Sequence, residues 1–341
     1  MSSLRILCPD APFADRGLFE QSLAGSDVDF VFRQARALDE LPAETLQDCD
    51  GVLSWHYIAW PKAAIERLGR CRAIMRSGVG FDHIDIEAAG ARGIAVLNTP
   101  DYGTGEVADH AMALLLALRR GIASHHDRLR ADPLSTWSGW QPPLIKRLRG
   151  AALGIVGLGR IGTAFALRAR SFGFRILAYD PYIPRGQEIA LGVERRDSLE
   201  ALLAESEIVS LHCPANAETR GMMNGQRFGA MQEGALLINT ARGAIVDLDA
   251  CHRALKSGRL GGAGLDVLPS EPPPADHPLI RAYSAQEDWL RDRLIITPHA
   301  AWYAPESWQD MRRLAVERLV AYLRHGEDSC VVNKVFLRKS A

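Results

Sequence analysis

Three polar side chains in the second half of the chain, Arg242, Glu271 and His299, are of types that together can move a proton and hold an anion. A histidine titrates near neutral pH, so it can donate a proton in one direction of a reaction and accept it in the other. A nearby carboxylate favours the imidazolium form, and a guanidinium binds carboxylate and carbonyl oxygens through its planar fork. We therefore expect His299 to act as acid and base, Glu271 to be its partner, and Arg242 to orient a substrate and polarise its carbonyl.

Each of these residues also has a structural interpretation when it is taken alone. Arg242 is compatible with a surface ion pair, Glu271 with a loop acid among prolines, and His299 with a core histidine. All three follow runs of residues that we expect to be strands, and in an open parallel sheet ligands bind outside the carboxyl ends of the strands. Their shared position favours one crevice and a catalytic role.

A glycine-rich segment between an expected strand and an expected helix has the GxGxxG pattern Gly157-Leu158-Gly159-Arg160-Ile161-Gly162. In this context the pattern is typical of a dinucleotide-binding turn. Gly157 permits the tight turn, Gly159 lets the backbone approach the pyrophosphate, and Gly162 lets the helix pack closely on the strand. The amides at the start of the helix then face the anion.

Asp180 ends the next expected strand, at about the 20-residue spacing where an acid accepts hydrogen bonds from the adenosine ribose. Its carboxylate would repel a 2′-phosphate, so we predict NAD rather than NADP as the cofactor. Arg185 is close enough in sequence to keep NADP open as an alternative. A glycine turn beside an unrelated surface aspartate is the other interpretation.

The elements that must position these residues alternate between strands and helices along the chain, which implies parallel sheets covered on both faces. The first series of expected strands comprises residues 4–8, 28–33, 51–55, 73–76 and 95–98. The second series comprises residues 152–156, 175–179, 208–212, 235–239, 262–266 and 294–297. The pattern predicts helices at 61–68, 84–90, 163–171 and 305–324, and an irregular arm at 132–143. The helix expected at 104–120 is apolar nearly all round, which favours burial on several sides. The predicted fold class is α/β, with two Rossmann-like domains and a cleft between them.

Bulk composition excludes some classes of function. The net charge is −1, so a nucleic-acid or acidic-membrane partner is not expected, and the short basic stretch 146–149 is expected on the surface. No apolar run approaches the roughly 18–20 residues that span a bilayer, and the N-terminus lacks the features of an export signal. The six cysteines are scattered without a CxxC pair, which favours reduced thiols over disulfides or a metal site. We expect a cytoplasmic protein that uses no metal.

The sequence resembles the D-isomer-specific 2-hydroxyacid dehydrogenases over nearly its whole length. The resemblance rests on motifs in the order of that family, namely residues 76–85, the GxGxxG segment with Asp180, 211–214 with 219–221, 238–243, 264–267 and 297–299. It implies hydride transfer between NAD(H) and C2 of a small D-2-hydroxy acid or 2-oxo acid. It also implies that Arg242, Glu271 and His299 are the catalytic residues.

The same resemblance implies a division of labour along the chain. The substrate-binding domain would comprise residues 1–100 and 301–341, and the NAD-binding domain residues 101–300. The helix and arm at 104–150 resemble the dimer interface of the family, so a homodimer is expected. Backbone amides of Gly78, Val79 and Gly80 would hold the substrate carboxylate. The NAD site would be lined, besides the glycine turn and Asp180, by Thr104, Cys213, Pro214, Thr219, Thr240, Ala241 and Asp266, with Asp266 near the nicotinamide and Cys213 there for packing.

Within the family, the motifs 76–78, 179–182 and 299–303 are similar to the C-terminal-binding-protein-like branch. There Arg76 would be a second contact to the substrate carboxylate. Trp302 would face the substrate side chain, which favours an apolar or thioether chain. The alternative for Trp302 is a core aromatic under the tail helix. The stretch 272–298 is longer than in most of the family, and we expect a surface loop insertion there.

Two rival classes of function are compared with these motifs, an NAD-sensing scaffold and another enzyme of the same superfamily. An NAD-sensing corepressor-like scaffold with weak or no turnover would keep a similar catalytic trio, although little chain is left for regulatory tails. A formate dehydrogenase of the same superfamily would carry Gln where this chain has Glu271, which argues against formate as the substrate. Binding of phosphoglycerate would need more cationic residues near the carboxylate site than Arg76 alone. Phosphite has no positive support in the sequence.

Overall fold

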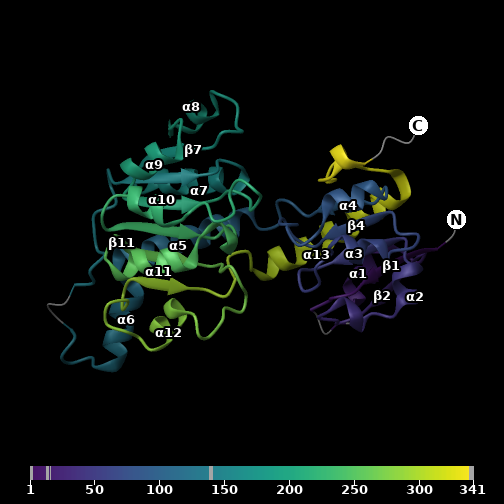
Figure 1. Cartoon of the computed structure of the whole chain (residues 1–341), viewed down its shortest axis with the longest axis horizontal. Coiled ribbons are helices and arrows are strands. Elements are labelled where there is room, and N and C mark those ends of the chain that lie inside the picture. Colours follow the sequence, from purple (N-terminus) through teal and green to yellow (C-terminus); the bar gives the residue numbers. More distant parts are fainter. Residues whose placement is uncertain (1–2, 13–14, 16, 138–140, 338–341) are drawn as a thin grey trace. The chain divides into compact units, whose positions relative to one another are not determined.

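The structure, a computed structural model, describes residues 3–12, 15, 17–137 and 141–337. It divides into two compact units (Figure 1). Unit 1 comprises the described residues up to Gly103 and from Ala304 onward, and unit 2 comprises Thr104–Tyr303. The boundaries expected from the sequence were at residues 100 and 300. Residues 138–140 of the expected arm lie outside the described residues.

Unit 1 contains a five-stranded sheet in which all strand pairs are parallel, in the order β2-β1-β3-β4-β5. Its strands are β1 (Leu4–Cys8), β2 (Val28–Phe32), β3 (Gly51–Ser54), β4 (Ala73–Arg76) and β5 (Ala95–Asn98). Helices α1 (Leu18–Ala24) and α13 (Pro305–His325) pack on each other, and α13 packs on β3 and β4. The remaining helices are α2 (Ala43–Gln47), α3 (Lys62–Glu66) and α4 (Ile86–Ala91). A core that includes Leu46, Ile65 and Ala89 joins these helices to the sheet.

Unit 2 contains a seven-stranded parallel sheet in the order β12-β11-β10-β9-β6-β7-β8. Its strands are β6 (Ala152–Val156), β7 (Arg175–Tyr179), β8 (Glu194–Arg195), β9 (Ile208–Leu211), β10 (Ala235–Asn239), β11 (Leu260–Leu265) and β12 (Leu294–Ile296). The two parallel sheets confirm the predicted α/β class. Strands β6, β9, β10 and β11 are buried along their whole length, as expected of strands covered on both faces.

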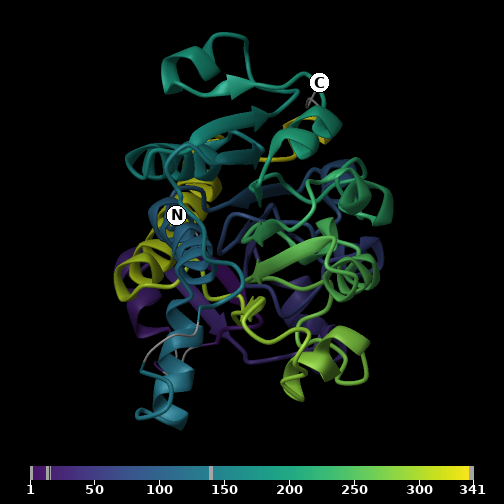
Figure 2. The ribbon, with the colours of Figure 1, turned by 90° about the vertical axis from the view of Figure 1, so that its left-hand side faces the viewer.

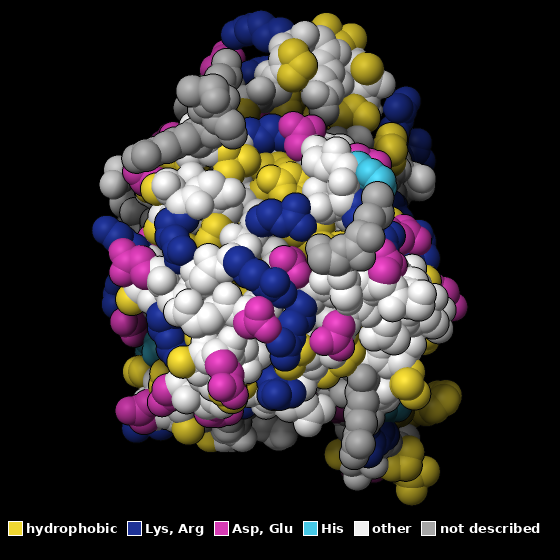
Figure 3. All heavy atoms as spheres, turned by 90° about the vertical axis from the view of Figure 1, so that its right-hand side faces the viewer, with side chains coloured by type: hydrophobic (Ala, Val, Ile, Leu, Met, Phe, Trp, Pro, Cys, Tyr) yellow, Lys and Arg dark blue, Asp and Glu magenta, His cyan; other side chains and the backbone are white. Residues whose placement is uncertain are grey.

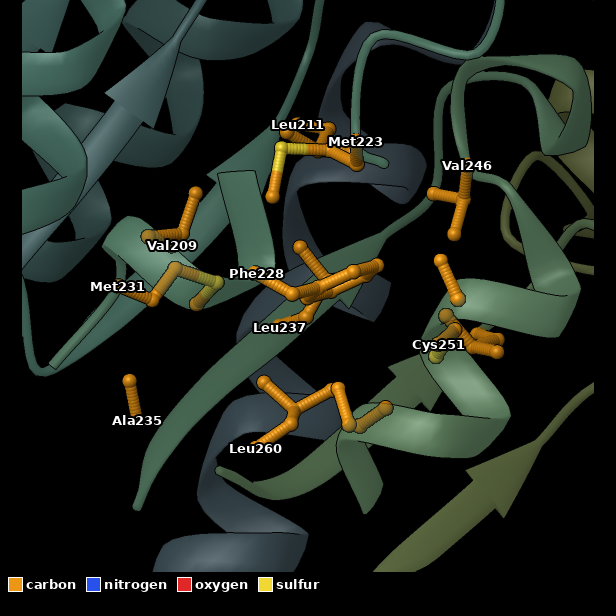
Figure 4. Packing of buried hydrophobic residues seen from close by; sticks show 14 of the residues in the cluster. Val209, Leu211, Met223, Phe228, Met231, Ala235, Leu237, Val246, Cys251 and Leu260 are labelled. Atoms are coloured by element: carbon orange, nitrogen blue, oxygen red, sulfur yellow. The ribbon is translucent and has the colours of Figure 1, made fainter. Parts of the chain in front are cut away.

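Two hydrophobic cores flank the sheet of unit 2. One contains side chains of α5 (Thr104–Arg120) and α7 (Arg160–Ser171). The other contains side chains of α9 (Leu199–Glu205), α10 (Gly225–Ala230), α11 (Leu248–Lys256) and α12 (Pro278–Ser284). Figure 4 shows part of this second core, where Phe228, Leu237 and Cys251 come together from a helix, a strand and another helix. Helix α5 is apolar nearly all round because it packs on α7 and also on β10, β11 and β12.

Unit 2 also contains α6 (Ile122–Ala131) and α8 (Gln187–Leu191). Like α9, α10, α11 and α12, these two helices were not among the ranges predicted from the sequence. Helix α6 extends away from the rest of unit 2 in both ribbon views (Figures 1 and 2). Its first residue, Ile122, is 60% exposed. A helix with few buried residues has little tertiary packing of its own within this unit.

The expectation of a surface loop at 272–298 is wrong in part. Most of the stretch is exposed, but besides the predicted strand β12 it contains α12, and Leu279 and Leu290 are buried in the core of unit 2. The Arg293 guanidinium donates hydrogen bonds to four backbone carbonyls, including those of Gly261 and Leu255. The stretch therefore contributes core packing. It does not displace the strand that leads to His299, since β12 pairs in parallel with β11.

Surface charge and thiols agree with the composition. On the face shown in Figure 3, Lys and Arg side chains are interspersed with Asp and Glu side chains. Lys146, Arg147 and Arg149 are exposed, as expected of the basic stretch. All six cysteines are free thiols. Within the described residues, no helix has both the length and the apolar character to cross a bilayer, and no group of three or more His, Cys, Asp or Glu side chains is placed to hold a metal ion.

Candidate active site

The glycine turn joins β6 to α7 in unit 2 and is built as the sequence predicts. Gly157 has a φ of 90°, and a Cβ atom there would lie 2.8 Å from the Cys213 nitrogen. A Cβ on Gly162 would lie 2.0 Å from the Gly157 oxygen, so only glycine lets α7 pack this closely on the turn. A Cβ on Gly159 would meet no described atom within 4 Å. The turn therefore leaves open space in front of the helix N-terminus, where the first amides of α7 have no acceptor within the helix.

Asp180 follows β7 and is fixed beside this turn. Its Oδ2 accepts a hydrogen bond from the Leu158 amide at 2.8 Å, and its Oδ1 accepts one from the Tyr182 amide at 2.9 Å. The carboxylate thus lies next to the glycine turn, as an acid that binds an adenosine ribose must. Arg185, which kept NADP open, lies 3.5 Å from the Asp197 carboxylate, and both side chains are more than four-fifths exposed.

Two buried polar atoms that follow β9 and β10 have no hydrogen-bond partner among the described residues, namely His212 Nδ1 and Thr240 Oγ1. His212 follows β9, next to the place where Gly157 packs, and its Nε2 lies 2.8 Å from Ser210 Oγ. Burial lowers the pKa of His212 to about 3, so its imidazole is neutral. Buried polar groups without partners are rare in native proteins. Together with the open space at Gly159, they fit a site for a polar ligand such as a dinucleotide.

The loop after β9 carries three more of the predicted cofactor contacts. Burial raises the pKa of the Cys213 thiol to about 11, so it stays protonated, which agrees with a packing role. The Thr219 hydroxyl donates a hydrogen bond of 2.5 Å to the Pro214 carbonyl and closes this loop. Of the other predicted contacts, Thr104 is half-buried at the start of α5, and Ala241 lies in the turn after β10.

Arg242 is positioned by the turn that follows β10. The fully buried Asn239 accepts a hydrogen bond from the Ala241 amide at 3.0 Å and donates one to the Arg242 carbonyl at 3.0 Å. A Cβ on Gly243 would lie 1.9 Å from the carbonyl carbon of Leu268, so the turn packs directly on the segment that precedes Glu271. The Asn239 side chain and Gly243 therefore bring Arg242 toward Glu271.

Glu271 and His299 form a hydrogen-bonded pair. His299 Nδ1 lies 2.7 Å from Glu271 Oε2, and the Leu268 amide donates to Glu271 Oε1 at 3.0 Å. The two side chains are 41% and 38% exposed, so the pair can reach a ligand. Burial raises the pKa of Glu271, but the hydrogen bond and charge of His299, the Leu268 amide and the Arg242 charge together hold it below its ordinary value. The structure thus brings together the three residues that the sequence predicts as catalytic.

The backbone of His299 is held in an uncommon conformation by Asp266. His299 has a φ of 53°, which side chains other than glycine rarely adopt. Asp266 is buried, and its carboxylate accepts hydrogen bonds from the Thr297 hydroxyl at 2.6 Å and from the amides of Ala300 at 2.9 Å and Ala301 at 3.0 Å. The loop that carries His299 is therefore fixed on both sides of it. The predicted contact between Asp266 and the nicotinamide stays a prediction.

Asn239, Thr297 and His110 are functional candidates that the sequence reasoning missed. His110 Nε2 lies 3.0 Å from Thr297 Oγ1 and 3.5 Å from Asp266 Oδ1, so it belongs to the same network. The signal for His110 was its titratable side chain on an otherwise apolar helix. Asn239 stood in a motif that resembles the family, but nothing in its position showed that its side chain shapes the turn.

In unit 1, the loop after β4 combines a guanidinium with exposed amides. Arg76 folds over the loop, where its side chain donates hydrogen bonds to the Gly80 carbonyl at 2.9 Å and to the Ser77 carbonyl. The Gly78 amide already donates to the Arg76 carbonyl at 2.9 Å. Of the three predicted amides, those of Val79 and Gly80 have no acceptor among the described residues. This loop therefore presents two amides beside a positive charge, which suits a carboxylate.

Trp302 is half-buried in unit 2, and its ring packs edge-on against Tyr303 with 5.6 Å between the ring centroids. It is absent from the two cores of unit 2 described above. One aromatic pair that involves the tail helix is Trp55 with Trp308, with 4.9 Å between the ring centroids. The role of Trp302, as a substrate contact or as a core aromatic under the tail helix, stays a prediction.

Comparisons with known proteins identify the family of this chain. The profile of the family described as "D-isomer specific 2-hydroxyacid dehydrogenase, NAD binding domain" matches residues 112–301. A glyoxylate reductase of Korarchaeum cryptofilum is 38% identical over 283 residues, which are 82% of each chain. One of Pyrococcus furiosus is 35% identical over 333 residues, which are 96% of each chain. The crystal structure of D-lactate dehydrogenase from Aquifex aeolicus, complexed with NAD and lactic acid, matches with a TM-score of 0.81 and 30% identity over 93% of this chain and 95% of that one.

The matched profile alone covers more than half of the chain, and the P. furiosus relative covers nearly all of it. The place of the chain among the branches of the family stays a prediction. This chain belongs to the D-isomer-specific 2-hydroxyacid dehydrogenase family, and it is an NAD-dependent oxidoreductase that transfers a hydride at C2 of a 2-hydroxy or 2-oxo acid.

Proposed function

We propose that His299 is the acid and base of this reaction, that Glu271 holds its imidazole, and that Arg242 orients the substrate. The observation that carries this assignment is the 2.7 Å hydrogen bond between His299 Nδ1 and Glu271 Oε2, on the sheet that also carries the glycine turn. This bond orients the ring and leaves Nε2 as the nitrogen that exchanges a proton with substrate. The lowered pKa of Glu271 keeps its carboxylate ionised at neutral pH.

Bound NADH supplies the hydride that is added to C2. In the direction of reduction, His299 Nε2–H donates its proton to the carbonyl oxygen of the 2-oxo acid, and the Glu271 carboxylate stabilises the imidazolium beforehand. Arg242 lies close enough for its charge to act on Glu271, and its guanidinium would polarise the carbonyl and hold the carboxylate. In the reverse direction, neutral His299 accepts the hydroxyl proton of the 2-hydroxy acid.

The residues that would hold NAD lie in unit 2. Amides at the start of α7, at Arg160, Ile161 and their neighbours, would bind the pyrophosphate, and Asp180 would bind the ribose and disfavour a 2′-phosphate. The unpartnered Thr240 hydroxyl would find an acceptor on the cofactor. The remaining proposed contacts are Thr104, Cys213, Pro214, Thr219, Ala241 and Asp266.

Unit 1 would bind the substrate carboxylate. The amides of Val79 and Gly80 and the guanidinium of Arg76 offer the donors, while Gly78 has a φ of 145° and holds the loop open. A Cβ on Gly78 would lie 2.8 Å from the carbon of the Arg76 guanidinium. We assign substrate binding to unit 1 and NAD binding to unit 2 on this basis.

The substrate side chain is inferred to be small. Two relatives are named glyoxylate reductases, and one solved relative is complexed with lactic acid, so their substrates carry hydrogen or a methyl group at C2. Trp302 would face this side chain and favour an apolar one. We propose glyoxylate and short apolar 2-oxo acids as the substrates, with the corresponding 2-hydroxy acids as products, of D configuration where C2 is chiral.

A homodimer formed through residues 104–150 is also proposed. The arm exposes large apolar side chains, with Leu134 91% and Trp137 78% exposed, and α6 extends from the unit beside them (Figures 1 and 2). Exposed apolar patches of this kind mark interaction surfaces. Sedimentation equilibrium of the purified chain measures its oligomeric state.

Free thiols at all six cysteines agree with a reducing compartment, and we infer the cytoplasm.

An NADH-consumption assay over a panel of 2-oxo acids tests the proposal. The panel contains glyoxylate, pyruvate, 2-oxoisocaproate and 4-methylthio-2-oxobutanoate, with NADH and NADPH in parallel and the configuration of each chiral product determined. We expect turnover with NADH, D products, and the highest kcat/KM among the smaller acids. Tight NADH binding without turnover of any acid would favour the corepressor-like scaffold instead.

A further inference from the structure

Two exposed side chains form a link across the carboxyl end of β6. Tyr182 follows β7, Glu218 lies in the loop after β9, and the Tyr182 hydroxyl donates a hydrogen bond to Glu218 Oε2. In the sheet, β6 lies between β7 and β9. The link therefore spans the strand that leads into the glycine turn.

Both ends of this link are attached to fixed loops. The Tyr182 amide donates to Asp180 Oδ1 at 2.9 Å. The Glu218 amide donates to the Asn216 side chain at 2.9 Å, and Asn216 also accepts from the Thr219 amide at 3.1 Å. The loops themselves are thus held in place, and only the phenol and the carboxylate need to rotate for the link to break.

The chemistry of the link suits repeated opening. The hydrogen bond to Glu218 raises the pKa of Tyr182, so the phenol remains a donor at neutral pH. Tyr182 is 73% exposed, and water competes for both partners. A hydrogen bond at such a site is weak in net terms, so thermal motion opens it readily.

We propose that Tyr182 and Glu218 form a gate over the adenosine end of the NAD site, which opens whenever the cofactor binds or leaves. This inference rests on the proposed cofactor site. With the ribose at Asp180 and the pyrophosphate at the start of α7, the adenosine lies between the two loops that the link joins. Adenosine then passes the link on its way in and out, and the link closes above it.

Stopped-flow NADH fluorescence with the full-length chain tests the gate. Tyr182→Phe keeps the ring but removes the hydroxyl donor. We expect the rate constants for NADH association and release to rise together by about 3- to 10-fold, the range that loss of one exposed hydrogen bond permits. The Kd should stay within about twofold, because the barrier is lowered equally in both directions. Tyr283→Phe, on α12, is the matched control and should leave both rates unchanged.

A second variant removes the other partner. Glu218→Ala should give the same increase, and the double variant should add nothing to either single variant, because both break one interaction. Glu233→Ala, at another exposed glutamate, is the control. Melting temperatures near the wild-type value show that the variants fold.

Three outcomes would overturn the gate. Rates within twofold of wild type in both variants would show that the link does not limit exchange. Tighter NADH binding with an unchanged release rate would show that the link occupies the place of the adenosine. Additive effects on the rate constants in the double variant would show that Tyr182 and Glu218 act independently of each other. The measurement also separates failure of the gate from failure of the proposed function. Wild-type protein that does not bind NADH would contradict the cofactor site. Normal NADH binding by wild type, with unchanged rate constants in the variants, would contradict only the gate.

Discussion

The glycine turn and the catalytic group lie on the same sheet of unit 2 but are built in different ways. The turn is local, since Gly157, Gly159 and Gly162 shape a single stretch of backbone between β6 and α7. The catalytic group is assembled from three separate loops, and two buried polar side chains, Asn239 and Asp266, hold those loops. The shape of the glycine turn thus depends on residues that lack side chains. The positions of the catalytic residues depend on hydrogen bonds made by buried polar side chains.

The largest effect that separates the two regions is expected from His299→Gln. Loss of the acid and base should lower kcat by about 10²–10⁴-fold. The NADH Kd should stay close to the wild-type value, because His299 lies outside the glycine turn. Steady-state kinetics and NADH fluorescence titration measure the two quantities. A variant with near-normal kcat would remove His299 from its proposed role.

The converse change is Gly159→Ala. A methyl group there meets no described protein atom, so the chain should fold and melt normally. It should obstruct the pyrophosphate and weaken NADH binding by about 100-fold. Gly162→Ala is the informative contrast, because its Cβ would lie 2.0 Å from the Gly157 oxygen and force the backbone apart. That variant should lose NADH binding and also melt several degrees lower, by the roughly 1–3 kcal/mol that overpacking costs. Equal melting temperatures for the two variants would show that the close packing of α7 is not needed.

A smaller effect is expected from Asp266→Asn, which tests whether a buried carboxylate holds the catalytic loop. The side chain of the variant has one oxygen that accepts hydrogen bonds and a nitrogen that only donates. It therefore cannot accept from the Thr297 hydroxyl and from both backbone amides as the carboxylate does, so the loop around His299 should shift. We expect kcat to fall by about 10- to 50-fold, since small displacements of a reacting group are costly. If Asp266 serves the cofactor instead, NADH affinity will fall by at least as much as kcat.

The smallest effect is expected from Glu271→Gln, which leaves a hydrogen-bond acceptor but removes the charge. Without the carboxylate the proton-donating ring loses its charged partner, so reduction should slow by about 3- to 10-fold at neutral pH. Steady-state measurement of kcat, compared with that of wild type, checks this. A kcat equal to that of wild type would mean that the charge of Glu271 is not needed.

The same pair gives a pH dependence of stability with a defined sign. Because the pKa of Glu271 is lowered in the folded protein, the pairing stabilises the fold fully above the ordinary carboxyl value of 4.5. That contribution is lost as pH falls through the lower value of the folded state. Below that pH the melting temperatures of wild type and Glu271→Gln should converge.

Much of the fold could be predicted because it depends on local pattern. Strands such as β4 and β6 were predicted to their last residue, since short apolar runs between turn residues have few alternatives. Strand β8 was missed because it has only two residues, both charged, and its Glu194 pairs with Arg175 of the neighbouring strand β7, a contact that no local pattern shows. The stretch 272–298 was misjudged because the apolar side chains that bury it, such as Leu279 and Leu290, are too sparse to show periodicity.

By itself, the sequence determined the types of the reacting groups, the dinucleotide turn and the family, because glycine spacing and motif order are properties of the chain alone. Only the tertiary structure decided which groups meet. It placed His299 against Glu271, showed Asp266 holding the loop that carries His299, and left the amides of Val79 and Gly80 rather than that of Gly78 without acceptors. Such choices depend on hydrogen bonds between residues that are distant along the chain, and no local pattern records them.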